Sequence, residues 1–167
     1  MTCSVKLRAL EPEDLELIHG IENDAELWPW AGDAQPYSRY AIRQYLAEQA
    51  GDIYKDRQLR LVVTCDETPV GIVDLTDFSP HHRRAEVGIV LLHDYHRQGI
   101  GTKALQLLSA YATERLHLRS LYAYVALDNA PAQALFRQLG YSEVGCLQGW
   151  IEGKQTATLF QLMLQDF

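Results

Sequence analysis

The chain has 167 residues, of which 47% are hydrophobic and 22% charged, and its formal net charge is −7. These values are typical of one globular domain with its own core, and the acidic balance argues against a general nucleic-acid binder. The cysteines Cys3, Cys65 and Cys146 are widely spaced and form no CxxC motif. We therefore expect reduced thiols, and neither a disulfide framework nor a zinc site.

The first third of the chain is expected to form a strand, two helices and a loop. Residues 4–10 alternate as in a strand, and Pro12, followed by two acids, suits the first turn of a helix. Residues 23–37 are rich in proline, glycine and tryptophan, which is typical of a loop. Ser38 is expected to cap a second helix that ends near Gly51.

The remaining elements alternate between strands and helices. A hairpin is expected over residues 59–78, with Asp66, Glu67 and Thr68 at its turn. The later elements, in order, are a strand over 85–92, a helix over 99–115, a strand over 121–127, a helix over 129–139, and strands over 141–147 and 156–164. Because strands flank the 99–115 helix, we expect one parallel pair in a mixed, mostly antiparallel sheet, hence an α+β fold in one domain over residues 1–167.

The stretch DYHRQGIGTKALQLL places two glycines, Gly99 and Gly101, at the start of a helix. The first N–H groups of a helix have no intrahelical partner, so they favour an anion, and glycine lets a diphosphate approach the backbone. Arg97 and Lys103 add positive charge, and Thr102 adds a hydroxyl. The stretch lacks the endings of a Walker loop and of a GxGxxG dinucleotide motif, and a simple tight turn also explains two glycines.

The order AEVGIVLL, HRQGIG, LYAYVAL and DNAPAQALFRQLGY, with the opening SVKLRALEPEDLELIH, resembles the GCN5-related N-acetyltransferase (GNAT) superfamily. The family loop [QR]xxGxG falls on residues 96–101, with His96 at the first position. The resemblance is closest to bacterial spermidine acetyltransferases and to acetyltransferases of ribosomal-protein N-termini. It implies a GNAT-like fold: a mixed, mostly antiparallel sheet flanked by helices.

The resemblance also implies an activity. Acetyl-CoA would be the cosubstrate, with no metal, and a primary amine of a small cationic molecule or of a peptide N-terminus would attack the thioester directly in a ternary complex. The residues that the resemblance assigns to CoA binding are Ile89, Val90, Leu91, His96, Arg97, Gln98, Gly99, Ile100, Gly101, Thr102 and Asn129. Asn129 would contact the pantetheine, although a helix cap is an equal alternative.

Acid and base catalysis are less well defined by the sequence. Many family members carry a tyrosine as general acid where this chain has Phe136, so Tyr141 and Tyr124 are the alternatives. Asp74 and Glu86, each on an expected strand, are candidate bases for the amine proton. Phe136 also favours the alternative of a non-catalytic acyl-CoA-binding relative that acts as a sensor or interaction module.

The segment between Ala9 and Ser38 contains no lysine or arginine. Its acids are Glu11, Glu13, Asp14, Glu16, Glu22, Asp24, Glu26 and Asp33. In the family this region borders the acceptor groove, so the acids would attract a cationic acceptor, unless they form only a solvated helix face.

Other side chains could take part in acceptor binding. Trp28 and Trp30 could contact an amine by cation–π interaction, or could pin the loop to the core. The acidic pair that spermidine acetyltransferases carry before a Pro-Tyr is replaced by neutral residues before Pro36. His93 and His96 form an HxxH pair for which the sequence shows no third metal ligand.

The expected location and partners follow from sequence patterns that the chain lacks and from the family resemblance. The chain has no apolar run of the roughly 18 residues that a membrane span needs, and its N-terminus has no signal-peptide pattern. We therefore expect a cytoplasmic protein that binds neither membrane nor nucleic acid. A homodimer follows by family analogy alone.

Overall fold

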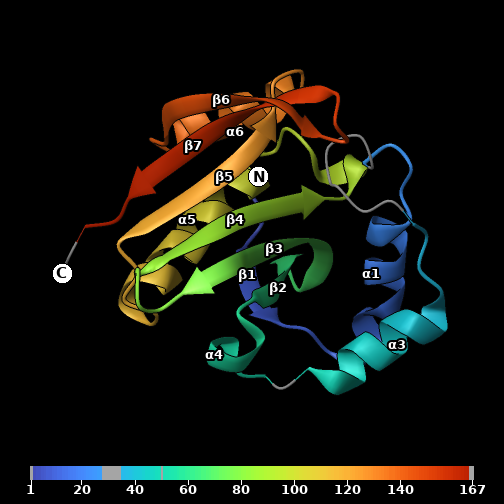
Figure 1. Ribbon diagram of the computed structural model, residues 1–167. Helices are drawn as coiled ribbons and strands as arrows, with labels where there is room; N and C mark the ends of the chain where they lie inside the picture. Colours follow the sequence, from blue (N-terminus) through green and yellow to red (C-terminus); the bar gives the residue numbers. More distant parts are fainter. Residues whose placement is uncertain (1, 28–34, 50, 166–167) are drawn as a thin grey trace.

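Seven strands form one sheet in the computed structural model, which describes residues 2–27, 35–49 and 51–165. The strands are β1 (Val5–Ala9), β2 (Leu59–Cys65), β3 (Thr68–Ser79), β4 (Arg84–Leu91), β5 (Ser120–Ala126), β6 (Ser142–Ile151) and β7 (Gln155–Met163). Their order across the sheet is β1-β2-β3-β4-β5-β7-β6, and only β4 and β5 are parallel (Figure 1). The mixed, mostly antiparallel sheet of the α+β prediction is confirmed.

Helices cover the two faces of this sheet unequally. They are the 3₁₀ turns η1 (Pro12–Asp14) and η2 (His93–Tyr95) and the helices α1 (Leu15–Glu22), α3 (Arg39–Glu48), α4 (Ile53–Asp56), α5 (Ile100–Glu114) and α6 (Ala130–Gln138). In Figure 1, α5 and α6 lie behind the sheet, and α1 and α3 pack together at one end of it. The larger hydrophobic core, which includes Leu75, Leu105 and Phe160, forms under α5 and α6.

A smaller core forms on the opposite face, where Ile18, Ile21 and Ile42 of α1 and α3 pack on Ile72 of β3. Side chains alternate between faces along a strand, so Asp74 lies on the same face as Ile72, beyond the helices. Glu86 of β4 lies opposite Thr76 of β3, and Tyr122 of β5 lies beside Glu86, so both side chains continue this face. None of the described helices lies over the middle of this face, and we call it the open face.

The predicted hairpin has Asp66 and Glu67 at its turn, both with positive φ, and Thr68 already in β3. Ser38 caps α3 as expected, since its hydroxyl accepts a hydrogen bond from the Ala41 N–H. This helix ends at Glu48, somewhat before the predicted Gly51. Residues 28–34 of the predicted 23–37 loop, with Trp28 and Trp30, lie outside the described residues.

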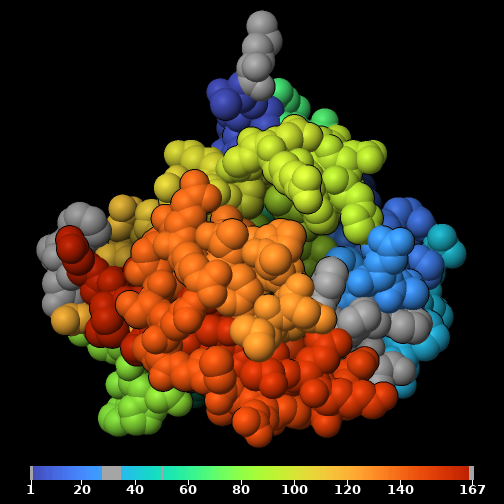
Figure 2. All heavy atoms as spheres, turned by 90° about the horizontal axis from the view of Figure 1, so that it is seen from above, coloured from blue at the N-terminus to red at the C-terminus, as the bar shows by residue number. Residues whose placement is uncertain are grey.

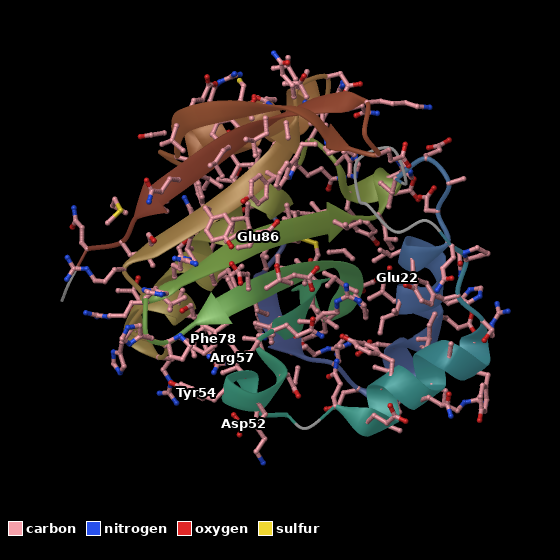
Figure 3. The ribbon with its side chains drawn as sticks, viewed as in Figure 1. Glu22, Asp52, Tyr54, Arg57, Phe78 and Glu86 are labelled. Carbon is pink, nitrogen blue, oxygen red and sulfur yellow. A yellow bond between two sulfur atoms is a disulfide. The ribbon has the colours of Figure 1, made fainter. Side chains whose placement is uncertain are left out.

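The four-residue helix α4 was not predicted. The Asp52 side chain accepts a hydrogen bond from the Tyr54 N–H at 3.0 Å and begins this helix. The Tyr54 ring meets Phe78 edge-on at 5.3 Å, and the Phe78 N–H donates to the Arg57 carbonyl, as the labels in Figure 3 help to locate. These contacts fix the end of β3.

Gly88 forms no bulge in the pairing of β3 with β4, although a glycine within a strand often marks one. The pairing of β3 with β4 is continuous at Gly88 and shifts instead between Thr76 and Ser79, where Asp77 has a φ of 46°. A Cβ at Gly88 would meet only the Asp74 side chain, at 3.7 Å. Gly88 therefore leaves space beside Asp74 on the open face.

The expectation of three reduced thiols is wrong, because Cys3 and Cys65 form a disulfide. They are 62 positions apart in the chain, but β1 pairs antiparallel with β2, with Val5 opposite Cys65. The pairing thus brings the two Cα atoms to 5.5 Å, which sequence spacing could not show. Cys146 is free and exposed. Among the described residues, no helix combines the length and apolar character needed to cross a membrane.

Candidate active site

A gap opens between β4 and β5. The two strands pair only where Arg84–Glu86 lie beside Ser120–Tyr122, and β4 then continues to Leu91 without this partner. The Leu92 N–H donates to the Val70 carbonyl, which fixes the hydrogen-bonding alternation between β3 and β4. By this alternation, the N–H groups of Ile89 and Leu91 point into the gap. The Val90 N–H points toward β3, so only two of the three predicted strand amides are available to a ligand.

The glycine turn, residues 96–102, leads from the end of β4 into α5. Gly99 precedes the helix with a φ of 76°, a left-handed conformation that glycine adopts without strain. No described residue accepts a hydrogen bond from the backbone N–H groups of residues 97–102. Unpaired first-turn N–H groups at the positive end of a helix favour a bound anion such as a diphosphate.

Two predicted side chains of this turn brace the turn itself. The His96 Nε2 lies 2.8 Å from the Leu91 carbonyl oxygen, and the Gln98 amide donates to the Asp94 carbonyl at 2.8 Å. Ile100 is buried in the core, so only its main chain faces the turn. Arg97 is exposed. The turn can therefore hold an anion mainly through its backbone.

Gly101 lies where α5 approaches β4 and α6. A Cβ there would lie 3.5 Å from a methyl of Leu135 and 3.6 Å from methyls of Ile89 and Leu91. A methyl group would fit, whereas a branched side chain would displace the strand whose amides face the gap. Figure 2 shows the segment entering α5, in yellow-green, and the orange segment around α6 on opposite sides of a hollow.

Asn129 caps α6, because its Oδ1 accepts a hydrogen bond from the Ala132 N–H at 3.3 Å. The capping alternative of the sequence prediction is thus realised, and the amide NH₂ group remains available for a further contact. A pocket of about 300 Å³ opens nearby at the end of β5, lined by Leu127, Asp128, Gln155 and Thr156.

Glu86 lies at the centre of the open face, opposite Thr76 of β3 and beside Tyr122 of β5 (Figure 3). Its carboxylate has no hydrogen bond or ion pair with any described residue. Burial, with a smaller effect of the nearby Asp77, raises the pKa of Glu86 above its ordinary value. A half-buried, unpaired carboxylate of raised pKa is suited to accept a proton.

Asp74, the other candidate base, is bound by an arginine that sequence reasoning missed. Arg60 of β2 donates from Nε to Asp74 and from Nη1 to Glu22, each at 2.8 Å, and its guanidinium lies 5.9 Å from the Tyr45 ring centre. Burial alone would lower the pKa of Arg60, but the two carboxylates outweigh it and raise that pKa. Asp74 is therefore held in a closed ion-pair triad, Glu22–Arg60–Asp74.

Aromatic side chains form the other side of the open face. Tyr122 donates its hydroxyl hydrogen to Asp77, and its ring lies 5.8 Å from that of Tyr124. Trp150 of β6 lies 5.2 Å from Tyr124. Tyr122, Tyr124 and Trp150 form the aromatic row, which runs from Glu86 toward the β6 edge.

Tyr141 does not lie near Glu86. It is 5% exposed in the larger core, where its ring meets Phe136 edge-on at 4.9 Å. Burial raises the pKa of Tyr141, an effect that Ser109 offsets only in part, and no hydrogen bond of ordinary geometry reaches its hydroxyl. Its environment favours a packing role over the predicted catalytic one, whereas Tyr124 is half-buried on the open face.

The acid-rich segment has cationic partners from outside it. Arg8 binds Asp14 through two hydrogen bonds of 2.8 Å, and Arg39 binds Glu16. His93 lies 3.4 Å from Asp24 and 3.2 Å from Glu26, so two acids do group with one histidine of the HxxH pair. These three side chains are partly or fully exposed, and we interpret them as an ion-pair cluster.

Comparisons with known proteins agree with this geometry. Residues 4–142 match the family model of the acetyltransferase (GNAT) domain. The chain is 34% identical over 142 residues to the spermidine N(1)-acetyltransferase of Escherichia coli K12, covering 85% of this chain and 75% of that one. It is 28% identical over 152 residues to the putative ribosomal N-acetyltransferase YdaF of Bacillus subtilis, covering 86% and 83%.

The fold also matches a solved structure. The spermidine N-acetyltransferase of Vibrio cholerae, in complex with CoA and spermine, superimposes with a TM-score of 0.86 at 24% identity, over 96% of this chain and 95% of that one.

Proposed function

We propose a mechanism from one established premise: the chain belongs to the acetyltransferase (GNAT) family. It is an N-acetyltransferase that uses acetyl-CoA as its cosubstrate. The proposed domain, residues 1–167, extends beyond the matched 4–142 because β6 and β7 complete the same sheet.

We assign acetyl-CoA to the β4–β5 gap. The unpaired amides of the glycine turn would hold the diphosphate, and the Ile89 and Leu91 N–H groups would hold the thioester carbonyl and the pantetheine arm. Fixed donors of this kind stabilise a developing oxyanion by about 3–4 kcal/mol each. These main-chain donors, free at the place where β4 leaves β5, are the observation that carries the proposal.

Glu86 is the proposed general base. An alkylammonium has a pKa of roughly 10 and must lose a proton before it attacks, so a carboxylate within reach of the gap is needed. Glu86 has no competing partner among the described residues, while Asp74 is bound by Arg60. The proton moves from the amine to Glu86 directly or through one water molecule.

Departure of the CoA thiolate has no tyrosine of α6 to assist it, because Phe136 stands at that position. Of the two phenols on the open face, Tyr122 donates its hydroxyl hydrogen to Asp77, so we propose Tyr124 as the donor in place of Tyr141. The names of the relatives do not support the alternative of acyl-CoA binding without transfer. Release of free CoA thiol from acetyl-CoA in the presence of amines separates the two, because a binding-only protein releases none.

The proposed acceptor is a primary amine of a small cationic molecule or of a peptide N-terminus. The names of the relatives, spermidine and ribosomal acetyltransferases, support this range. The deciding experiment measures CoA release with polyamines, simple amines, aminoglycosides and peptides, alongside calorimetric titration with CoA. Absence of both release and binding would refute the proposal.

Location and assembly are proposals of the same kind. We propose a cytoplasmic homodimer, testable by fractionation and by light scattering coupled to size exclusion. A thiol count on freshly isolated protein would show whether Cys3 and Cys65 are joined in the cell.

A further inference from the structure

Glu22 and Asp74 form an acidic corner of the open face. The guanidinium of Arg60 lies between them, so a cation of the protein itself occupies this corner. The side chain of Arg60 and those of Glu22 and Asp74 are 23%, 19% and 22% exposed. Removing one partner from such a partly buried network leaves a charge without compensation, so the network is expected to stay closed when a ligand enters. Glu22 and Asp74 are therefore unavailable to a cationic acceptor.

Two further acids of the 9–38 segment are paired with arginine in the same way. Asp14 is bound by Arg8, and Glu16 by Arg39. An acidic wall attracts a polycation through its summed charge, and each internal guanidinium removes one unit from that sum. The absence of lysine and arginine between Ala9 and Ser38 therefore overstates the negative potential of this region.

Two carboxylates of the open face have no arginine or lysine partner among the described residues, Glu86 and Asp77. Asp77 accepts the hydroxyl hydrogen of Tyr122 and lies at the exposed bulge of β3. Glu86 has neither a hydrogen bond nor an ion pair with any residue that the structure describes. Glu86 is thus the place for a single ammonium group.

An acceptor that extends from Glu86 across β5 meets rings. Tyr122 is the neighbour of Glu86 in register, Tyr124 follows on the same face, and the ring of Trp150 lies tilted beside Tyr124 with 53% of its surface exposed. The aromatic row carries no formal charge. Its rings can pack on an apolar or aromatic body, whereas a second ammonium group would find no carboxylate there.

We propose that Arg60 is a specificity-determining residue, and that the preferred acceptor is a primary amine with one positive charge and an apolar or aromatic body. Its ammonium group lies at Glu86 and its body packs on Tyr124 and Trp150. Polyamines are poorer acceptors because Arg60 occupies the corner that would take their second charge. This inference rests on the proposed acetyl transfer at the open face.

The first test compares acceptors at saturating acetyl-CoA by CoA release. We expect kcat/KM for phenethylamine to exceed that for spermidine by about tenfold or more. Loss of apolar contacts between substrate and pocket typically lowers kcat/KM by about this factor. Trp150→Ala should lower kcat/KM for phenethylamine by about tenfold and leave that for ethylamine unchanged. Val144→Ala is the matched control, because Val144 is equally exposed on the same strand, away from the aromatic row.

The second test removes the internal cation. Arg60→Met removes the positive charge between Glu22 and Asp74, and it should raise kcat/KM for spermidine relative to phenethylamine by about tenfold. Arg60→Lys keeps the positive charge and should keep the preference for phenethylamine. If Arg60→Met does not fold, Arg60→Gln, which also carries no charge, replaces it and should show the same change in preference; an unchanged preference would overturn the role of Arg60.

The outcomes separate this inference from the function on which it rests. A wild-type preference for spermidine, with no effect of Trp150→Ala on phenethylamine, would overturn the inference and leave acetyl transfer intact. Absence of CoA release with every amine would count against acetyl transfer itself.

Discussion

The two halves of the proposed cleft are built from different parts of the polypeptide. The CoA half consists of main-chain N–H groups within one stretch, from Ile89 to Thr102, where a strand loses its partner and a helix begins. The acceptor half consists of side chains brought together from α1 and five strands. A backbone site depends on the course of the chain, whereas a side-chain site depends on which residues meet. The first should therefore be sensitive to backbone volume, and the second to single charges and rings.

The largest effect is expected from Glu86→Gln, which removes the proposed base and leaves the fold intact. We expect kcat to fall about 100-fold, the usual contribution of a general base, while the Kd for CoA stays the same. A stopped assay of CoA release and a calorimetric titration measure the two quantities. An unchanged kcat would remove Glu86 from the mechanism.

The pH dependence of the wild type sharpens this test. A base must be ionised to act, and burial with the nearby Asp77 raises the pKa of Glu86. The rate should therefore fall as the pH drops through a pKa above the ordinary 4.5 of glutamate, and this limb should vanish in Glu86→Gln. Acceptors of different amine pKa distinguish it from the ionisation of the amine, because only the latter limb moves with the acceptor.

The next effect concerns the backbone half. In Gly101→Val the branched side chain overfills the space between Ile89 and Leu135, which moves the strand amides. Overpacking of this kind costs about 2 kcal/mol, so we expect the Kd for CoA to rise about 30-fold. Gly20→Ala in α1, where a Cβ meets nothing within 4 Å, is the control and should leave the Kd unchanged. Equal affinities in the two variants would contradict the assigned CoA site.

Asp74→Asn should affect stability rather than chemistry. The change weakens the bond to Arg60 and should lower the free energy of unfolding by about 2 kcal/mol, with a much smaller change in kcat than in Glu86→Gln. Chemical denaturation measures the difference. Glu67→Gln, which removes an exposed ion pair with Lys6, is the comparison and should hardly change stability. If kcat of Asp74→Asn fell as far as that of Glu86→Gln while the free energy of unfolding stayed unchanged, Asp74 would be the base.

The smallest effect is expected at Asn129, where α6 begins. Asn129→Ala loses the α6 cap and should cost about 1 kcal/mol of stability. Asn129→Asp keeps the accepting oxygen and loses the amide donor, so it should regain stability and still show a raised KM for acetyl-CoA. If the aspartate variant recovers both properties, the residue acts as a cap alone.

The sequence predicted the backbone half well because its signals are local. The glycines at 99 and 101, the strand before them and the helix after them lie within one short stretch, and the prediction of a parallel pair at this crossover is confirmed. The local pattern could not show that β4 extends beyond its short pairing with β5. The two free amides, and the direction of the Val90 N–H, follow from that long-range geometry.

The acceptor half was harder to predict because it depends on register. Arg60 lies directly opposite Asp74 only because the pairing of β2 with β3 shifts by one residue between Val63 and Thr64. Without the shift Arg60 would face Val73, so counting back from the turn gives the wrong partner. The guanidinium partners of Asp14, Glu16 and Glu22 likewise come from outside the segment whose charge was counted.

The bond between Cys3 and Cys65 makes the first part of the chain a covalent ring. Glu22, Tyr45 and Arg60 lie inside that ring, and Glu86 with the whole glycine turn lies in the linear tail. A protease that cuts once within the ring leaves both fragments in a single molecule on a non-reducing gel, whereas one cut in the tail separates them at once. Peptide mapping with and without reductant therefore tells cuts in the part of the cleft that holds Glu22, Tyr45 and Arg60 from cuts in the rest of the cleft by connectivity alone.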